Sequence, residues 1–174
     1  GMTHSFEEGN TWPGLRPKDG PGGADDIAKA KALMAEAGYP DGFKTRYDVR
    51  QVGTYPDQCT VVKETLKGVL GIDGEMTTYP SAAGYAVFGT SRSPDSDGDW
   101  ELACQGEGQV VLDVDGIMGG VYLKGATRNY TDWHNDKVDA WFDAQKQEPD
   151  PAKRIAINKE MEAFLFTQED NHWI

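Results

Sequence analysis

Strand-like and helix-like patterns alternate along this chain, and that alternation limits its fold more than any other feature of the sequence. Residues 43–50 alternate apolar and polar side chains, which is the period of a strand with one buried face and one face in solvent. Tyr47 and Val49 belong to the expected buried face, and Asp48 and Arg50 to the expected wet face. Strands that alternate with helices predict an α/β fold with a mixed, mostly parallel sheet flanked by helices. Further strand patterns lie at residues 75–80 and 100–104, and helical patterns begin near Asp25, Pro56, Ser81, Asn135 and Pro151.

The length and composition of the chain predict one folded domain. Its 174 residues suffice for a single core of ordinary size. Residues 1–24 are rich in Gly, Pro and charge, and we expect a tag remnant, Gly1 before Met2, followed by a flexible or linker segment. Residues 25–174 are expected to form a single α/β lobe.

The charge of the chain argues against nucleic acid as a partner. It carries 17 basic and 29 acidic side chains, a formal net charge of −12 at pH 7, whereas proteins that hold phosphates need clustered Lys and Arg. No run of about 18 apolar residues is present, so no membrane-spanning helix is expected. Cys59 and Cys104 lack the spacing of a metal site and are expected to be buried thiols, and whether they pair is left open. We expect neither a metal nor a cofactor.

Three motifs suggest chemistry, and each is incomplete. The Gly106–Gly108 turn lacks the third glycine of a phosphate loop, and Glu107 would repel phosphate. The acidic stretch at 95–99 lacks the Glu that completes a calcium loop. A small hydrolase that uses Glu107 with Asp113 or Asp115 stays open as an alternative, although no nucleophile motif accompanies these carboxylates.

Several tyrosines lie near the ends of the expected elements. Tyr55 follows the first strand, Tyr85 lies on the helix that starts at Ser81, and Tyr130 follows Asn129 in a polar segment. Ligands of open α/β sheets bind beyond the carboxyl ends of the strands. These tyrosines and Asn129 are therefore candidate ligand-binding residues, with a structural role for Asn129 and Tyr130 equally open.

The order of the motifs resembles a known family of binding proteins. The succession is "DDIAKAKALMAEAGYPDGF", "YPDQCTVVKETLKGVLGID", "DWELACQGEG" and "RNYTDWHNDKVDAWFDAQKQEPDPAKRIAINKEMEAFLFTQEDNHWI". It resembles the family 5 extracellular solute-binding proteins, the peptide- and nickel-binding receptors of ABC importers, over residues 25–174. The resemblance implies the C-terminal lobe of a receptor whose two lobes close on a ligand by a hinge.

The resemblance also implies a ligand-binding segment after the third strand. Family members typically carry Gly-Trp-Gly-Ala-Asp-Tyr there, and in peptide-binding members the Asp receives the amino terminus of the ligand. In this chain Gly106 and Gly108 match, whereas Glu107, Gln109 and Val110 replace Trp, Ala and Asp. The cleft-facing residues implied are Glu107, Gly108, Gln109 and Val110. Because a buried ammonium group needs a paired charge, Glu107 is the candidate for that role in place of the missing Asp.

The implied function is the binding of a peptide-like or other small polar solute, without catalysis. The implied partners are that ligand, the N-terminal lobe of the same receptor and an ABC permease. The implied location is periplasmic or extracellular, with a membrane tether in the full-length protein left open. A third alternative is an interaction module that forms a homodimer through its exposed cleft face.

Overall fold

The computed structural model describes residues 11–12, 16–89, 100–106 and 113–167 of the chain. The chain divides into two compact units, which are described separately below. We call Pro17–Gly106 the sheet unit, and Gly1–Arg16 together with Glu107–Ile174 the helical unit. Each unit contains a hydrophobic core of its own. The single lobe expected over residues 25–174 stays a prediction.

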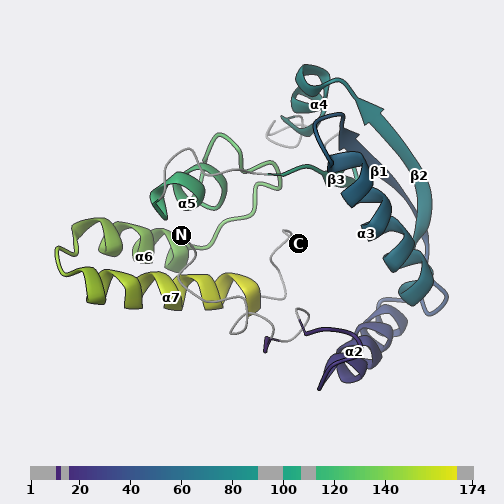
Figure 1. Ribbon diagram of the computed structural model, residues 1–174, viewed down its shortest axis with the longest axis horizontal. Coiled ribbons are helices and arrows are strands. Elements are labelled where there is room, and N and C mark those ends of the chain that lie inside the picture. Colours follow the sequence, from purple (N-terminus) through teal and green to yellow (C-terminus); the bar gives the residue numbers. More distant parts are fainter. Residues whose placement is uncertain (1–10, 13–15, 90–99, 107–112, 168–174) are drawn as a thin grey trace. The chain divides into compact units, whose positions relative to one another are not determined.

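A three-stranded parallel sheet forms the centre of the sheet unit (Figure 1). The middle strand is β1 (Lys44–Arg50), with β2 (Asp73–Tyr79) paired to one edge and β3 (Leu102–Cys104) to the other. The helix α3 (Tyr55–Leu70) carries the chain from the end of β1 back toward the start of β2, and α4 (Ser81–Phe88) follows β2. The predicted α/β fold with a parallel sheet flanked by helices is therefore confirmed.

One face of the sheet packs against α3. Tyr47 and Val49 are completely buried there and pack against Cys59 of the helix. These are the residues that the alternation of the strand assigned to the core. Gly71 ends α3 with a left-handed φ of 72°, which glycine adopts without steric cost. The helix can therefore turn directly into β2.

The other face of β1 is not the wet face that the alternation predicts. Asp48 is 0% exposed and Arg50 is 6% exposed. Gly84 of α4 lies directly against the aliphatic part of Arg50, so the helix covers this face near the end of the strand. Asp48 is buried with its charge paired, because it accepts hydrogen bonds from Arg46 Nε at 2.8 Å and from the hydroxyl of Tyr79 at 2.9 Å. The prediction was wrong because a polar side chain with partners can occupy a covered face.

Cys59 and Cys104 form a disulfide, which corrects the expectation of two buried thiols. The bond joins α3 to the last residue of β3 across a sequence separation of 45 residues. Cysteines that far apart in sequence meet only because β1 and α3 bring them together. Disulfides persist in oxidising environments, which agrees with the extracellular location that the sequence implies.

The helical unit is built on two neighbouring helices that run alongside each other, α6 (Asp136–Gln147) and α7 (Pro151–Thr167) (Figure 1). Asn135 caps α6 by accepting a hydrogen bond from the amide of Lys137, and Asp150 accepts one from the amide of Ala152 at the start of α7. Both starts were predicted from sequence. The short α5 (Asp115–Val121) was not. The core of the unit contains Met118, Trp133, Val138, Phe142, Met161 and Leu165.

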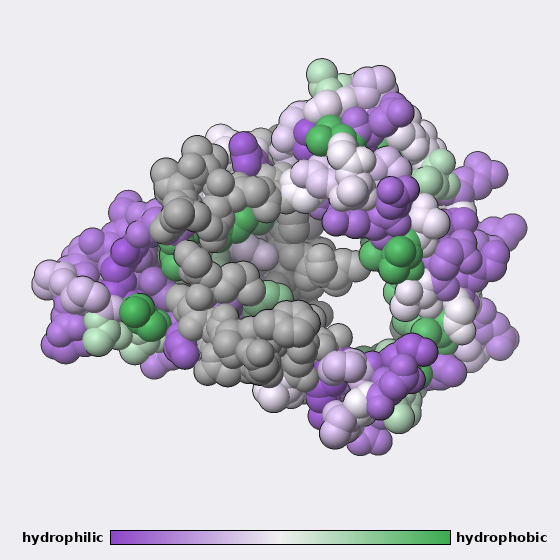
Figure 2. All heavy atoms as spheres, viewed as in Figure 1, coloured by the Kyte–Doolittle hydropathy of each residue, from purple (hydrophilic) through white to green (hydrophobic). Residues whose placement is uncertain are grey.

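Polar residues cover most of the described surface. Figure 2 shows the hydrophobic residues of that view as small separate patches among hydrophilic ones. Single exposed apolar side chains are normal on protein surfaces, so these patches identify no binding face by themselves. Among the helices of the described ranges, none is long and apolar enough to cross a membrane.

Candidate functional site

The carboxyl ends of the parallel strands bring together the residues that follow them. Arg50 ends β1 and pairs in register with Tyr79, the last residue of β2. Ser81 begins α4 just after β2, and Gln105 follows β3. Since all three strands point the same way, these residues gather at one edge of the sheet. We call Arg50, Tyr55, Ser81, Tyr85, Gln105 and Gly106 the Arg50 cluster.

Arg50 lies at the centre of this cluster. Its guanidinium carbon is 3.6 Å from the ring centroid of Tyr85 and 5.9 Å from that of Tyr55, within the range of cation–π contacts. Its Nη2 donates to the Ser81 hydroxyl at 2.8 Å, and its Nη1 donates to the Gln105 carboxamide oxygen at 3.3 Å. These contacts hold a buried cation in one orientation.

The guanidinium of Arg50 has no anionic partner among the described residues. The hydrogen bonds of its Nη atoms to described residues go to neutral oxygens, and its buried Nε has no hydrogen-bond partner in the part of the chain that the structure describes. A buried cation without a counter-ion costs several kcal/mol, roughly, and a buried donor without an acceptor adds about 1–3 kcal/mol. The cluster is therefore suited to receive an anionic group.

Tyr55 connects α3 to the segment after β3. Its hydroxyl donates a hydrogen bond to the carbonyl of Gly106 at 3.1 Å. A Cβ added at Gly106 would lie 2.8 Å from the ring and the hydroxyl of Tyr55, closer than real Cβ atoms come. Glycine is therefore required at position 106 for this close approach, which is a structural reason for the first glycine of the predicted segment.

The structure brings together two of the residues predicted to bind ligand. Tyr55 and Tyr85 both lie beside Arg50, as expected of residues near the carboxyl ends of the strands. Three members of the cluster were missed: Arg50, Ser81 and Gln105. A usable signal was their sequence position, since each lies at or just after the end of an expected strand. The predicted residues Glu107, Gly108, Gln109 and Val110 lie outside the described residues.

Asn129 and Tyr130 lie in the helical unit, and both are buried. The side-chain nitrogen of Asn129 donates to the backbone carbonyl of Trp133 at 2.6 Å, and its oxygen accepts from the Thr131 hydroxyl at 3.2 Å. These bonds shape the turn that precedes α6. They favour a structural role for Asn129, which is only 2% exposed.

The two aspartates of the hydrolase alternative are bound to an arginine. Arg154 of α7 donates to both oxygens of Asp113, at 2.6 and 2.9 Å, and lies 3.6 Å from Asp115. The hydrogen bonds from Arg154, together with one from the backbone amide of Asp115, lower the pKa of Asp113 to about 2. A carboxyl group with that pKa stays ionised at neutral pH and cannot serve as a general acid. The arrangement connects the start of α5 to α7.

This ion pair predicts a loss of stability in acid. Because the pKa of Asp113 is lower in the folded protein than its ordinary value of 3.8, its stabilising contribution is complete above about pH 4 and disappears as the pH falls toward 2. Urea unfolding measured between pH 5 and pH 2 is expected to show this decline. Asp113→Asn should make the free energy of unfolding depend less on pH between pH 5 and pH 2. Asp132→Asn, which changes an exposed aspartate of the same unit, should leave this pH dependence unchanged. An equal slope in wild type and Asp113→Asn contradicts the assignment.

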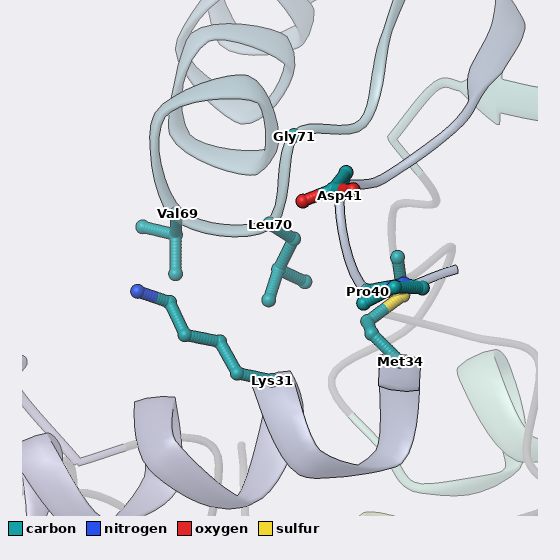
Figure 3. A pocket seen from close by; sticks show the side chains of 7 residues that line it. All are labelled: Lys31, Met34, Pro40, Asp41, Val69, Leu70 and Gly71. Atoms are coloured by element: carbon teal, nitrogen blue, oxygen red, sulfur yellow. The ribbon is translucent and has the colours of Figure 1, made fainter. Parts of the chain in front are cut away.

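A hollow on the surface of the sheet unit lies away from the Arg50 cluster. It has a volume of about 230 Å³ and lies between α2 (Gly23–Glu36) and the end of α3. Figure 3 shows Lys31 and Met34 of α2 on one side of it and Val69 and Leu70 on the other. Because α3 starts beside the end of β1 and returns to the start of β2, this hollow lies near the amino ends of the strands. That is the edge where ligands of α/β sheets do not bind.

No group of metal-ligating side chains occurs among the residues that the structure describes. The acidic stretch at 95–99 lies outside them. The chemistry of the Arg50 cluster is that of neutral and cationic hydrogen-bond donors, with two aromatic rings. The chemistry of such a set suits an anionic or polar ligand better than a metal cation.

Comparison with protein families gives one match. The family described as bacterial extracellular solute-binding proteins, family 5 Middle, matches residues 3–155. No curated protein sequence matches the chain.

Three solved structures illustrate the similarity in fold. The periplasmic binding protein DppA of Helicobacter pylori, in complex with the peptide STSA, has 23% identity and a TM-score of 0.67 over 80% of this chain and 26% of its own. The murein tripeptide binding protein MppA of Escherichia coli has 16% identity and a TM-score of 0.71 over 89% and 29%. NikA of Staphylococcus aureus, in complex with Ni(L-His)2, has 20% identity and a TM-score of 0.63 over 78% and 28%. The chain thus spans less than a third of the length of each.

Proposed function

Because this chain belongs to the family 5 bacterial extracellular solute-binding proteins, we propose that it is the C-terminal substrate-binding lobe of an ABC-importer receptor. Proteins of this family are extracellular or periplasmic receptors and have no catalytic activity. In this proposal the ligand is a peptide-like or other small polar solute. The partners are the N-terminal lobe of the same receptor and an ABC permease, and a membrane tether in the full-length protein stays an open prediction.

The observation that carries the proposal is the unpaired guanidinium of Arg50. It lies at the carboxyl ends of parallel strands, beside two tyrosine rings, without an anionic partner among the described residues. A carboxylate is the group that an arginine fork binds best. Peptides and histidine carry carboxylates, and two of the relatives described above, DppA and NikA, were solved with a peptide and with a nickel–histidine complex. We therefore place the carboxylate of the solute at Arg50.

Glu107 supplies the complementary charge in this proposal. It is joined directly to Gly106, which belongs to the Arg50 cluster. An ammonium group of the ligand at Glu107 and a carboxylate at Arg50 together define a zwitterionic solute, as a free peptide is. Gly108, Gln109 and Val110 follow as further contact residues, and Tyr55 and Tyr85 provide the aromatic surface. Pairing of two copies through the same face stays a prediction, which sedimentation tests.

A titration of this chain with a free peptide tests the proposal. The probes are trialanine with a free carboxylate and trialanine amide, each added at millimolar concentration because a single lobe offers only part of the contacts. In ¹H–¹⁵N spectra, the backbone N–H resonances of residues 50–55, 79, 81–85 and 104–106 are expected to shift when trialanine is added. Trialanine amide should need about ten times the concentration to cause the same shifts. Equal responses to the two probes would contradict a carboxylate site at Arg50.

A further inference from the structure

Two ties hold the end of β3 against α3. The first is the disulfide between Cys59, in the second turn of α3, and Cys104, the last residue of β3. The second is the hydrogen bond from the Tyr55 hydroxyl, at the start of the same helix, to the carbonyl of Gly106. Only one residue, Gln105, lies between the two tied positions. We call this pair of ties the α3 latch.

The sheet itself holds this segment weakly. β3 pairs with β1 at three positions only, Leu102, Ala103 and Cys104, and the pairing ends at Cys104. A strand of three residues at one edge of a sheet has few ladder hydrogen bonds, and short edges open easily. The backbone of Gln105 and Gly106 is therefore fixed mainly by the α3 latch.

The residue that the latch fixes contacts the guanidinium. Gln105 accepts a hydrogen bond from Arg50 Nη1 at 3.3 Å. Among the described residues, this contact is one of two hydrogen bonds that orient the Arg50 side chain, the other being to Ser81. If Gln105 moves, Arg50 loses the partner on one side, and its Nη1 no longer points in a fixed direction. The latch thus acts on Arg50 through Gln105.

We propose that the α3 latch is a positioning device for the solute site: the Cys59–Cys104 disulfide and Tyr55 hold Gln105 in place, and Gln105 orients Arg50 toward the carboxylate of the solute. The inference rests on the proposed function of Arg50 as the carboxylate site. It assigns to the disulfide a role in ligand affinity. It also makes that affinity depend on an oxidising compartment, where the bond persists.

The buried position of the disulfide decides how it is reached. Cys59 is 1% exposed, whereas Cys104 is only half-buried. A reductant therefore reaches the bond from the side of β3. A water-soluble phosphine reduces the disulfide to two thiols. One water molecule supplies the two protons of the thiols, and its oxygen is bound by the phosphine, which becomes phosphine oxide. Removal of the phosphine and oxidation by air re-form the bond, so the same sample provides its own rescue.

Hydrogen exchange measures the latch without any ligand. The amides of residues 104–106 are expected to exchange at least about ten times faster after reduction and to recover after reoxidation. The amides of α6 and α7 should be unaffected. Cys59→Ala combined with Cys104→Ala should reproduce the reduced state. Unchanged exchange at residues 104–106 would falsify the latch.

The second tie is tested by removing a single oxygen atom. Tyr55→Phe keeps the ring and deletes the hydrogen bond to Gly106, and it should raise exchange at Gly106 by about three- to tenfold. Tyr39→Phe, a half-exposed tyrosine of the same unit, is the matched control and should change nothing. Equal exchange in Tyr55→Phe and Tyr39→Phe removes Tyr55 from the latch.

The link from the latch to Arg50 is measured by two readouts. The side-chain amide resonances of Gln105 are expected to move on reduction and to move in the same direction in Arg50→Met. The dissociation constant for trialanine is expected to rise about three- to thirtyfold on reduction. If Gln105 resonances and trialanine affinity both stay unchanged while exchange rises, the latch is purely structural. If the oxidised protein does not bind trialanine at all, the proposed function is wrong. The response of the Gln105 resonances to reduction then shows by itself whether the latch orients Arg50.

Discussion

Arg50→Met is expected to remove the preference of this protein for a carboxylate over an amide. The guanidinium is the only cation in the described part of the cluster, and hydrogen bonds to a charged group contribute about 1.5–3 kcal/mol, which corresponds to about ten- to a hundredfold in affinity. Trialanine and trialanine amide should therefore bind Arg50→Met equally weakly. Titration by ¹H–¹⁵N spectra, or by calorimetry on a receptor that contains both lobes, gives the two constants.

The folded state is expected to survive this substitution. Methionine has an unbranched side chain that can replace the aliphatic part of arginine, and replacing a buried charge by a hydrophobic residue is often neutral or stabilising. The free energy of unfolding of Arg50→Met should therefore equal or exceed that of wild type. Lys44→Met is the matched control, because Lys44 is an exposed cation at the other end of the same strand and its loss should leave the preference intact. A full preference for the acid in Arg50→Met would refute the assignment of the site.

The fold was predictable because its signals are local. The alternation around Tyr47 and Val49 places both residues in the core, and the apolar spacing before Gly71 defines α3. These patterns need no knowledge of what packs against the element. The same reasoning failed at Asp48 and Arg50. Whether a polar face is covered depends on α4, which is contributed by a different part of the chain, and on partners such as Tyr79 that the pattern of one strand does not contain.

The candidate site was predictable only in part, for the same reason. Tyr55 and Tyr85 were chosen because they lie near the ends of expected elements, and the structure places both beside Arg50. Arg50 was missed because alternation assigned it to solvent. The pairing of Cys59 with Cys104 leaves no local trace, since it results from the crossover between β1 and β2 that brings α3 over β3. Contacts that depend on topology cannot be read from the spacing of residues.

The close pairing of β2 with β1 gives the largest expected effect on stability. Gly74 lies opposite Thr45 in the register of the two strands, and a Cβ at Gly74 would overlap the carbonyl oxygen of Thr45. That oxygen belongs to the backbone of the central strand, so no side-chain rotation relieves the clash. Gly74→Ala is expected to separate the strands and to lower the free energy of unfolding by at least about 3 kcal/mol, the upper end of the cost of overpacking.

Substitution of a second glycine in the sheet unit by alanine is expected to have the opposite effect on stability. Gly68 lies inside α3, and nothing lies within 4 Å of a Cβ added there. Gly68→Ala is therefore expected to raise the free energy of unfolding by about 0.5–1 kcal/mol, because alanine loses less backbone entropy in a helix. Urea unfolding followed by circular dichroism compares the two variants. Hydrogen exchange should show that the stability lost in Gly74→Ala is lost in the sheet unit. Because β1 carries Arg50, separation of β2 from β1 should also leave Arg50 without a fixed position. Gly74→Ala with wild-type stability would show that the two strands do not approach as closely as described.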